Sequence, residues 1–359
     1  MHPRVDDAPL RLAVIGCGRV IERYHVPALR RTPEWNVVGA CDPLRVRLDW
    51  IRTQFDHASV FATLDDLADG CGADAALVAT PPCTHREVVV RALESGLHVL
   101  VEKPMALSAT EAEAMWQASL RTRNYLAVGF SRRFKRCYAE LRQRLAGLGP
   151  GEIRRVRFDL VGNAAAWRPV TGFIGSDERG GGVLDDMASH QLDLLPWLLR
   201  RRVSRIRVRG EERSQQADTI AYEVEFDDGV TAVCTAGHGM PKDETLRVEL
   251  RDHQLIVSAD RLLTLRFRSA AAARAHCRVR RLADRLLRRH GQTDDDVTVF
   301  ARQLHAFATL VRSNGATDVA DASSGVSTVR CVEACRDSIR SRGGWIAVER
   351  VRTTGSGEM

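Results

Sequence analysis

The sequence predicts an α/β domain with a doubly wound parallel sheet, followed by an α+β domain with an antiparallel sheet. In the first 130 residues, nearly continuous apolar runs alternate with segments of helical periodicity, which is typical of strands that helices bury on both faces. After residue 150, polar and apolar residues alternate within short segments, as in antiparallel strands with one exposed face. The length of 359 residues suits two domains, and an apolar content of 44% excludes general disorder.

The first part contains five apolar runs that we interpret as strands, with helical segments between them. The strands are Arg11–Ile15, Asn36–Cys41, Asp74–Ala79, Leu97–Val101 and Tyr125–Gly129, and two of the helices are Thr84–Ser95 and Ser108–Arg121. The carboxyl ends of such strands meet at one edge of the sheet, where ligands bind.

The second part begins after a glycine-containing break at Gly147–Gly151. The predicted strands are Ile153–Val161, Arg205–Gly210, Thr219–Phe226, Val230–Gly237 and Leu246–Arg251, and Asp227–Gly229 is a hairpin signal. The predicted helices are Leu184–Leu199, Ala270–Arg289, Asp295–Arg312 and Ala322–Arg342. We expect Pro196 to kink or shorten the first of these helices.

Charge and cysteine usage exclude several classes of protein. The net charge is +7, and three of the 53 basic residues are lysines (Lys103, Lys135 and Lys242), so 50 are arginines. The arginines are scattered apart from one run at Arg274–Arg289, which argues against nucleic-acid binding. The nine cysteines form no C-x-x-C pair and no zinc-ligand spacing, so we expect no metal site and reduced thiols. Neither a signal-peptide pattern nor an apolar stretch of about 20 residues occurs, so we expect a cytoplasmic protein without membrane contact.

The end of the first strand carries a candidate dinucleotide site. It reads Gly16-Cys17-Gly18-Arg19-Val20-Ile21, where Gly16 permits a tight turn and Gly18 lets a pyrophosphate approach the backbone. Ile21 departs from the small residue usual at the third fingerprint position, and a turn without a ligand is the alternative.

Asp42 ends the second strand, about twenty residues further on. A carboxylate there accepts hydrogen bonds from the adenosine ribose and repels a 2′-phosphate, which predicts NAD. Two alternatives stay open: Asp42 caps the loop before Pro43, or Arg45 and Arg47 favour NADP.

Two more strand ends reach the same edge. Thr80-Pro81-Pro82 follows one strand, and His85 then opens a helix, either toward the cofactor or toward solvent. Glu102 and Lys103 follow the next. In a chain with three lysines, the choice of lysine at this edge indicates chemistry that a guanidinium cannot perform.

The segment Gly180–His190 supplies the partner groups. Glycines lead into a helix on which Asp186 and His190 are four residues apart, so we expect them on one face, with Asp186 orienting a His190 base. Asp193 shares that general face. A purely structural pair is the alternative.

These motifs resemble a known family when taken together. The G-x-G strand end, Ala-x-Asp, Thr-Pro-Pro-x-x-His, Glu-Lys-Pro, Gly-Phe-x-Arg-Arg-Phe and Gly-Gly-x-x-x-Asp-x-x-x-His occur in this order. The set is similar to the glucose–fructose oxidoreductase / inositol dehydrogenase / rhizopine catabolism (Gfo/Idh/MocA) family of NAD(P)-dependent oxidoreductases, over roughly residues 10 to 350. The resemblance implies a Rossmann domain (1–130) and an α+β domain (131–359) with a large, open, predominantly antiparallel sheet. It also implies a last helix that returns toward the Rossmann domain.

The resemblance also implies site residues and an activity. Lys103 matches the family's Glu-Lys-Pro lysine, and Asp186 and His190 match its Asp-x-x-x-His pair. The expected reaction is hydride transfer between a nicotinamide and a secondary alcohol or ketone of a cyclitol, sugar or sugar derivative. An NAD-dependent glycosidase of the same family and a non-catalytic dinucleotide-binding sensor are the alternatives.

Four further residues are candidate contacts for a polyol substrate. Arg132 and Arg133 follow the strand that ends at Gly129, and we expect one to reach the substrate and the other a structural carboxylate. Trp167 and Arg168 precede the glycine run and offer an aromatic face and a donor. The alternative for all four is domain packing.

The alternating C-terminal strands also predict assembly. We expect Val208, Val224, Val233 and Val248 to form an apolar face opposite the helices, although the register is uncertain by one residue. Such a face predicts a homodimer, or a homotetramer of two such dimers, through this sheet. The alternative is a monomer in which Ala270–Arg289 covers the face.

Overall fold

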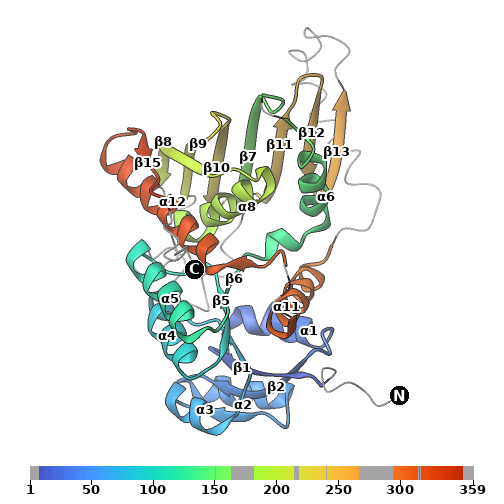
Figure 1. The fold of residues 1–359 in the computed structure, drawn as a ribbon, viewed down its shortest axis with the longest axis vertical. Coiled ribbons are helices and arrows are strands. Elements are labelled where there is room, and N and C mark those ends of the chain that lie inside the picture. Colours follow the sequence, from blue (N-terminus) through green and yellow to red (C-terminus); the bar gives the residue numbers. More distant parts are fainter. Residues whose placement is uncertain are drawn as a thin grey trace, which may run out of the picture.

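The computed structural model describes residues 8–149, 151–162, 182–213, 218–239, 241–266, 294–313, 315 and 317–350. Two sheets organise these residues, with the N-terminal sheet below and the C-terminal sheet above in Figure 1. The fold class predicted from the sequence, a parallel α/β sheet followed by a largely antiparallel sheet, is confirmed.

The described N-terminal sheet has seven strands in the order β14-β6-β5-β4-β1-β2-β3. Their bounds are β1 Leu10–Ile15, β2 Trp35–Cys41, β3 Ser59–Phe61, β4 Ala75–Val78, β5 His98–Glu102, β6 Leu126–Gly129 and β14 Ala320–Asp321. Neighbouring strands are parallel except β14, which is antiparallel to β6. The carboxyl ends of β1, β4, β5 and β6 therefore share one edge.

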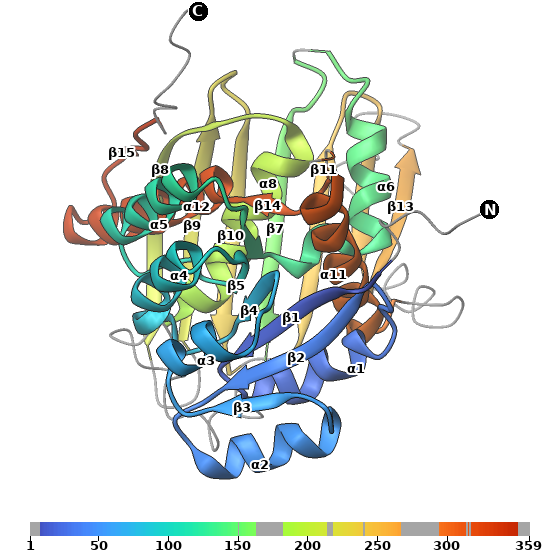
Figure 2. The same ribbon diagram turned by 60° about the horizontal axis from the view of Figure 1, so that its bottom comes forward.

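Helices cover both faces of this sheet, which explains why its strands are apolar throughout (Figure 2). One face is packed by α3 (Leu64–Gly70), α4 (His85–Glu94) and α5 (Ala109–Thr122). The other is packed by η2 (Ile21–His25), α1 (Val26–Leu29), α2 (Arg45–Gln54) and α11 (Asp296–Ser313). The late helix α11 is anchored by stacked rings, with Phe300 on Tyr24 and Phe307 on Trp35.

The described C-terminal sheet has eight strands in the order β13-β12-β11-β7-β10-β9-β8-β15. Their bounds are β7 Arg155–Gly162, β8 Val203–Arg213, β9 Asp218–Phe226, β10 Thr231–His238, β11 Asp243–Glu249, β12 His253–Ser258, β13 Arg261–Arg266 and β15 Ile346–Ala347. Neighbouring strands are antiparallel except β7 and β10, which are parallel.

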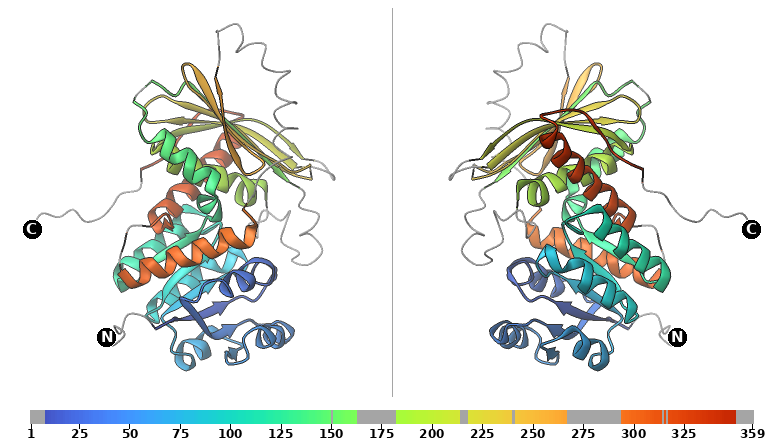
Figure 3. Two further views of the ribbon diagram at one scale, coloured as in Figure 1. Left: turned by 90° about the vertical axis from the view of Figure 1, so that its right-hand side faces the viewer. Right: turned by 90° about the vertical axis from the view of Figure 1, so that its left-hand side faces the viewer.

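Helices cover one face of this second sheet (Figure 3). They are α6 (Arg136–Leu145), α8 (Ser189–Leu199) and α12 (Ala322–Arg340). Helix α12 contacts α5 and β6 on one side and α8 and β8 on the other, so it joins the two domains.

The strand register of the C-terminal sheet differs from the one that the predicted apolar outer face requires. Val208, Val224 and Val248 are at most 5% exposed and pack under the helices, so that part of the prediction is wrong. Only Val233, which is half-buried, lies on the opposite face. Because successive side chains alternate between faces, a register one residue away exchanges the buried and outer sets.

Charged ladders occupy much of that outer face instead. Arg205 pairs with Glu225, and Glu223 accepts from both Arg207 and Arg209.

Several helices and strands differ from the sequence prediction. Pro196 does not shorten α8, which continues to Leu199; the ring removes one backbone N–H, but the Pro196 carbonyl still accepts the Arg200 N–H. The alternation did not reveal α2, α3, α6, β3, β12 or β13. The predicted helix Ala270–Arg289 lies outside the described residues. In the part of the chain that is described, no helix combines the length and apolarity needed to cross a bilayer.

Candidate active site

The loop after β1 allows close approach to its backbone. Gly16 has a φ of +84°, and a Cβ there would lie 2.8 Å from a backbone carbonyl just after β4, so only glycine fits. A Cβ on Gly18 would meet no described atom within 4 Å, which leaves space over the chain. Arg19 and Val20 follow, half-buried, at the start of the helical segment. This open backbone is the kind of surface that a pyrophosphate requires.

Asp42 lies beside this loop at the end of β2. One carboxylate oxygen accepts a hydrogen bond from the Cys17 backbone N–H at 2.8 Å, and the other accepts one from the Leu44 N–H at 2.9 Å. Asp42 therefore caps its own loop and also fixes the glycine loop. Each oxygen keeps a further lone pair that can accept a hydroxyl.

The two arginines that could favour NADP are engaged elsewhere. Arg45 pairs with Asp49 at 2.9 Å, and Arg47 pairs with Glu22 at 3.1 Å. These surface ion pairs are weak, but neither guanidinium is without a carboxylate partner.

His85 joins the loops after β4 and β5. Its ring is fully buried, with Nε2 2.9 Å from the Thr80 carbonyl and Nδ1 2.9 Å from the Pro104 carbonyl. The solvent-facing alternative is therefore wrong. Burial lowers the pKa of His85, although both carbonyls oppose the shift. Within the loop that it supports, Pro81 is exposed and Pro82 is buried.

Glu102 has a buried partner that the sequence did not indicate. One of its oxygens lies 2.7 Å from His25 Nε2, and the other accepts the Lys103 backbone N–H at 3.2 Å. His25 is fully buried and packs edge-on against Phe300. Glu102 thus ties the end of β5 to η2.

Lys103, Asp186 and His238 form a compact charged cluster. Lys103 Nζ donates one hydrogen bond to Asp186 Oδ1 and a second, of 3.1 Å, to the Asp186 main-chain carbonyl. His238 Nε2 lies 2.8 Å from Asp186 Oδ2. Burial alone would raise the pKa of Asp186, but the Lys103 ammonium and the His238 hydrogen bond outweigh it and hold that pKa below its usual range.

The predicted Asp186–His190 hydrogen bond is wrong. Both carboxylate oxygens of Asp186 have other partners, and His190 Nδ1 is buried with no partner in the described chain. The turn that contains Asp186, η7 (Leu184–Ala188), is π-helical with i→i+5 hydrogen bonding, so a spacing of four no longer aligns the two side chains as in an α-helix.

His190 lies at the start of α8, 7% exposed, with the Phe130 ring edge-on at 6.3 Å. Burial lowers its pKa well below the usual value, and the nearby charges of Arg132 and Lys103 add to this. The imidazole is therefore neutral near pH 7.

The two consecutive arginines after β6, Arg132 and Arg133, bind different carboxylates. Arg133 makes two hydrogen bonds to Asp193, at 2.9 and 2.5 Å, and both side chains are buried. Arg132 donates through Nε to Glu244 at 3.3 Å, and Glu244 also accepts from Lys135. The η nitrogens of Arg132 have no acceptor among the described residues.

Some predicted site residues fall in parts of the chain that the structure does not describe. Trp167, Arg168, Gly180 and Gly181 lie outside the described residues, as does the run Arg274–Arg289.

Sequence reasoning missed His25, Glu244 and His238. Each lies far in sequence from the group it contacts. For His238, the available signal was its position at the end of a predicted strand.

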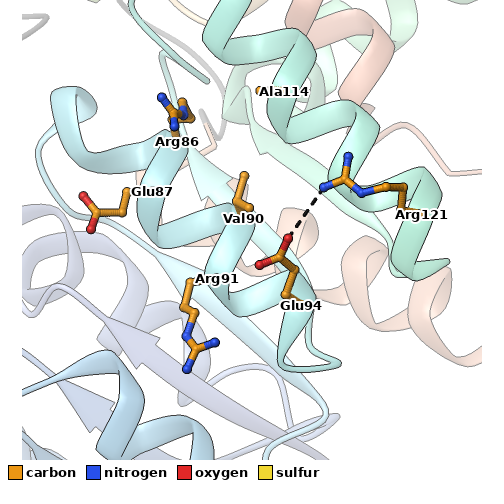
Figure 4. Close-up of a pocket in the computed structure, with 7 residues that line it drawn as sticks. All are labelled: Arg86, Glu87, Val90, Arg91, Glu94, Ala114 and Arg121. Carbon is orange, nitrogen blue, oxygen red and sulfur yellow. Dashed lines mark ion pairs between the residues drawn. The ribbon is translucent and has the colours of Figure 1, made fainter.

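A surface groove between α4 and α5 is separate from this site (Figure 4). It is lined by Arg86, Glu87, Val90, Arg91, Glu94, Ala114 and Arg121. An ion pair of 3.6 Å between Arg121 and Glu94 spans the two helices. None of the residues of the glycine loop or of the Lys103 cluster lines it.

Comparison with known proteins matches both domains to one family. Residues 10–130 match the oxidoreductase family with an NAD-binding Rossmann fold, and residues 138–253 match the Gfo/Idh/MocA C-terminal domain.

Curated relatives of the chain include inositol dehydrogenases. Over 251 residues, the chain is 30% identical to myo-inositol dehydrogenase Hyg17 of Streptomyces leeuwenhoekii, covering 67% of this chain and 74% of that protein. It is 27% identical over 249 residues to the scyllo-inositol 2-dehydrogenase (NAD(+)) of Bacillus subtilis, covering 67% and 71%.

Solved structures share the fold. The myo-inositol 2-dehydrogenase from Lactobacillus plantarum has a TM-score of 0.76 at 19% identity, covering 95% of this chain and 100% of that one. The WlbA dehydrogenase from Bordetella pertussis, in complex with NADH and UDP-GlcNAcA, has a TM-score of 0.77 at 18% identity, covering 96% and 99%.

Proposed function

Because the chain belongs to the Gfo/Idh/MocA family of NAD-dependent oxidoreductases, we propose that it transfers hydride between NAD and a secondary alcohol or ketone of a cyclitol, sugar or sugar derivative. The observation that carries the proposal is the cluster of Lys103, Asp186 and His238 with His190, at the edge of the sheet that also carries the glycine loop. The inositol dehydrogenases and the D-glucoside 3-dehydrogenase of Escherichia coli among the relatives support this substrate class.

The residues present fit a dinucleotide. The tight turn at Gly16 and the open space over Gly18 leave room for the pyrophosphate, and Asp42 can accept hydrogen bonds from the ribose hydroxyls. The cofactor side of the site is completed by Thr80, Pro81, Pro82 and the strand end at Glu102–Lys103. His85 supports this side through its contacts with the Thr80 and Pro104 carbonyls. When bound, the nicotinamide accepts or donates the hydride. Asp42 favours NAD over NADP.

His190 and Lys103 act on the oxygen of the reacting carbon. The neutral His190 receives the hydroxyl proton in oxidation and returns it in reduction. Lys103 Nζ, held by Asp186, donates a hydrogen bond to the same oxygen and stabilises its negative charge. Arg132, with its η nitrogens unpartnered in the described chain, binds further substrate hydroxyls, while Arg133 holds Asp193.

A panel of cyclitols and sugars with NAD, followed by nicotinamide absorbance, tests the proposal. Turnover of at least one secondary alcohol, lost in His190→Ala and kept in Lys242→Ala, is the expected result. Hydrolysis of a glycoside without net change in added NAD would instead identify the glycosidase alternative. Tight NADH binding without turnover of any alcohol, ketone or glycoside in the panel would favour the sensor.

We also propose that the protein is cytoplasmic and forms a homodimer or homotetramer through the outer face of the C-terminal sheet. Support comes from this face itself, which no helix of the described chain covers.

A further inference from the structure

We propose that His238 is a positioning residue of this site: its Nε2–H holds the Asp186 carboxylate in the orientation that presents it to Lys103. The inference rests on the proposed function, because it concerns the lysine assigned to the reacting oxygen.

The hydrogen bonds of Asp186 divide its carboxylate between two donors. Lys103 Nζ donates to Oδ1, and His238 Nε2 lies 2.8 Å from Oδ2. An ionised carboxylate can only accept, so the His238 nitrogen at this contact must carry the proton. A carboxylate held at both oxygens cannot turn about its Cβ–Cγ bond without breaking one of these contacts.

His238 is a rigid point from which to hold a neighbour. It is the last residue of β10 and is paired in register with Gly162 of β7 and Asp218 of β9, so strands flank it on both sides. Its side chain is 2% exposed. Asp186, in contrast, lies on the π-helical turn η7, which contacts β10 and β7.

The His238 ring has no competing hydrogen bond in the described chain. Its Nδ1 is buried without a partner, so the contact with Asp186 accounts for all of the ring's described hydrogen bonding. A histidine that served only the packing of the sheet would not need a nitrogen directed at this carboxylate.

Loss of the His238 donor leaves Oδ2 of the half-buried Asp186 side chain without its hydrogen bond. The carboxylate then turns toward another donor, and Lys103 Nζ keeps only the Asp186 main-chain carbonyl. The ammonium group becomes less well placed for the substrate oxygen and more accessible to reagents.

The scarcity of lysine makes this measurable. The chain has only Lys103, Lys135 and Lys242, so trace labelling with acetic anhydride and mass spectrometry reports each one. Lys242 is exposed and serves as the internal reference. The variants are His238→Leu, which removes the donor, and His238→Gln, whose amide N–H restores one at similar reach. His253→Leu is the control, because His253 lies on the same sheet with Asp252 as its hydrogen-bond partner.

In His238→Leu we expect kcat to fall about tenfold, as for loss of one hydrogen bond to a charged group, and Lys103 to label faster relative to Lys242. His238→Gln should restore both readouts, and His253→Leu should change neither. NADH affinity and the thermal midpoint establish that each variant is folded. If His238→Leu does not fold, His238→Gln is compared with His238→Asn, whose shorter amide cannot reach Asp186.

Unchanged Lys103 labelling in His238→Leu would overturn the proposal, as would equal loss of turnover in the Leu and Gln variants. Failure of the proposed function is distinguishable: a wild-type protein without turnover on any alcohol removes only the kinetic readout. The labelling comparison then decides the role of His238 alone.

Discussion

His190 and Lys103 differ in the way that their surroundings control charge. Burial and two neighbouring cations keep His190 unprotonated, whereas Lys103 is paired with a carboxylate that His238 also holds. A neutral imidazole and a fixed ammonium on one oxygen suit a reaction in which a proton and a hydride leave the same alcohol.

Removal of either group should therefore affect turnover more than binding. We expect His190→Ala and Lys103→Ala each to lower kcat by about 10²–10⁴, the usual range for a general acid–base, while NADH binding is retained. Steady-state kinetics and NADH fluorescence titration measure the two effects. Wild-type turnover in either variant on the true substrate would show that its assigned role is wrong.

Asp186→Asn should be milder than His190→Ala. The amide oxygen can still accept from Lys103, and the base itself remains, so the losses are the charge that attracts the ammonium and the acceptor for His238. The ratio of the two kcat values on one substrate checks this order. A larger loss in Asp186→Asn would make the carboxylate charge more important than the imidazole.

Asp42 should determine the choice of cofactor. Its carboxylate at the end of β2 repels a 2′-phosphate, and Arg45 and Arg47 are paired with other carboxylates. We expect kcat/KM to be higher with NAD than with NADP, and Asp42→Ala to reduce this difference in kcat/KM. The matched comparison is Asp49→Ala, which frees Arg45 from its ion pair. A clear preference of the wild type for NADP would contradict the role of Asp42.

At the scale of elements, the sequence predicts strands well where the apolar pattern is local. Local signals, from residues adjacent along the chain, were enough to predict the apolar strands β1, β2, β4, β5 and β6 and the glycines after β1. The predicted contact between Asp186 and His190 was wrong for two reasons. The turn that contains Asp186 is π-helical, and Lys103, 83 residues away in sequence, binds the carboxylate instead. His238 and Glu244 escaped prediction for the same reason, since their importance depends on long-range contacts.

The ion pair between Arg133 and Asp193 joins the segment after β6 to α8, and it predicts a pH-dependent stability. In Arg133→Met, Asp193 is left as a buried, uncompensated carboxylate, which costs about 3–5 kcal/mol of unfolding free energy at neutral pH. Burial already raises the pKa of Asp193 against the opposing charge of Arg133, and loss of Arg133 raises it further.

The direction of this pH dependence follows from the linkage between proton binding and folding. A carboxyl whose folded pKa exceeds its unfolded value destabilises the fold in full above the folded pKa, and this cost shrinks as the pH falls from the folded toward the unfolded pKa. Denaturant unfolding of Arg133→Met should therefore show a deficit that shrinks from pH 8 toward pH 5, and adding Asp193→Asn should remove this pH dependence. A deficit of equal size at both pH values would indicate lost packing rather than a buried charge.

At the scale of the molecule, α11 and α12 tie the end of the chain back onto the N-terminal domain and leave the outer face of the C-terminal sheet without a helix of the described chain. The prediction that this face is apolar was wrong, because Val208, Val224 and Val248 turn inward. The face carries charged ladders instead, in which Glu223 holds Arg207 and Arg209, so an assembly through it would bring these charges into the interface.

This composition makes the predicted oligomer sensitive to salt and to charge reversal. Light scattering at micromolar concentration should give the mass of a dimer or tetramer, and added salt should shift it toward one chain, because exposed charges are screened within about 10 Å at 0.1 M. Glu223→Arg should dissociate the assembly, since it places a third arginine beside two others. Asp65→Arg, which breaks a comparable surface pair with Arg91 on the N-terminal domain, should leave the mass unchanged. A wild-type mass of one chain at every concentration would eliminate the interface and favour the alternative in which Ala270–Arg289 covers this face.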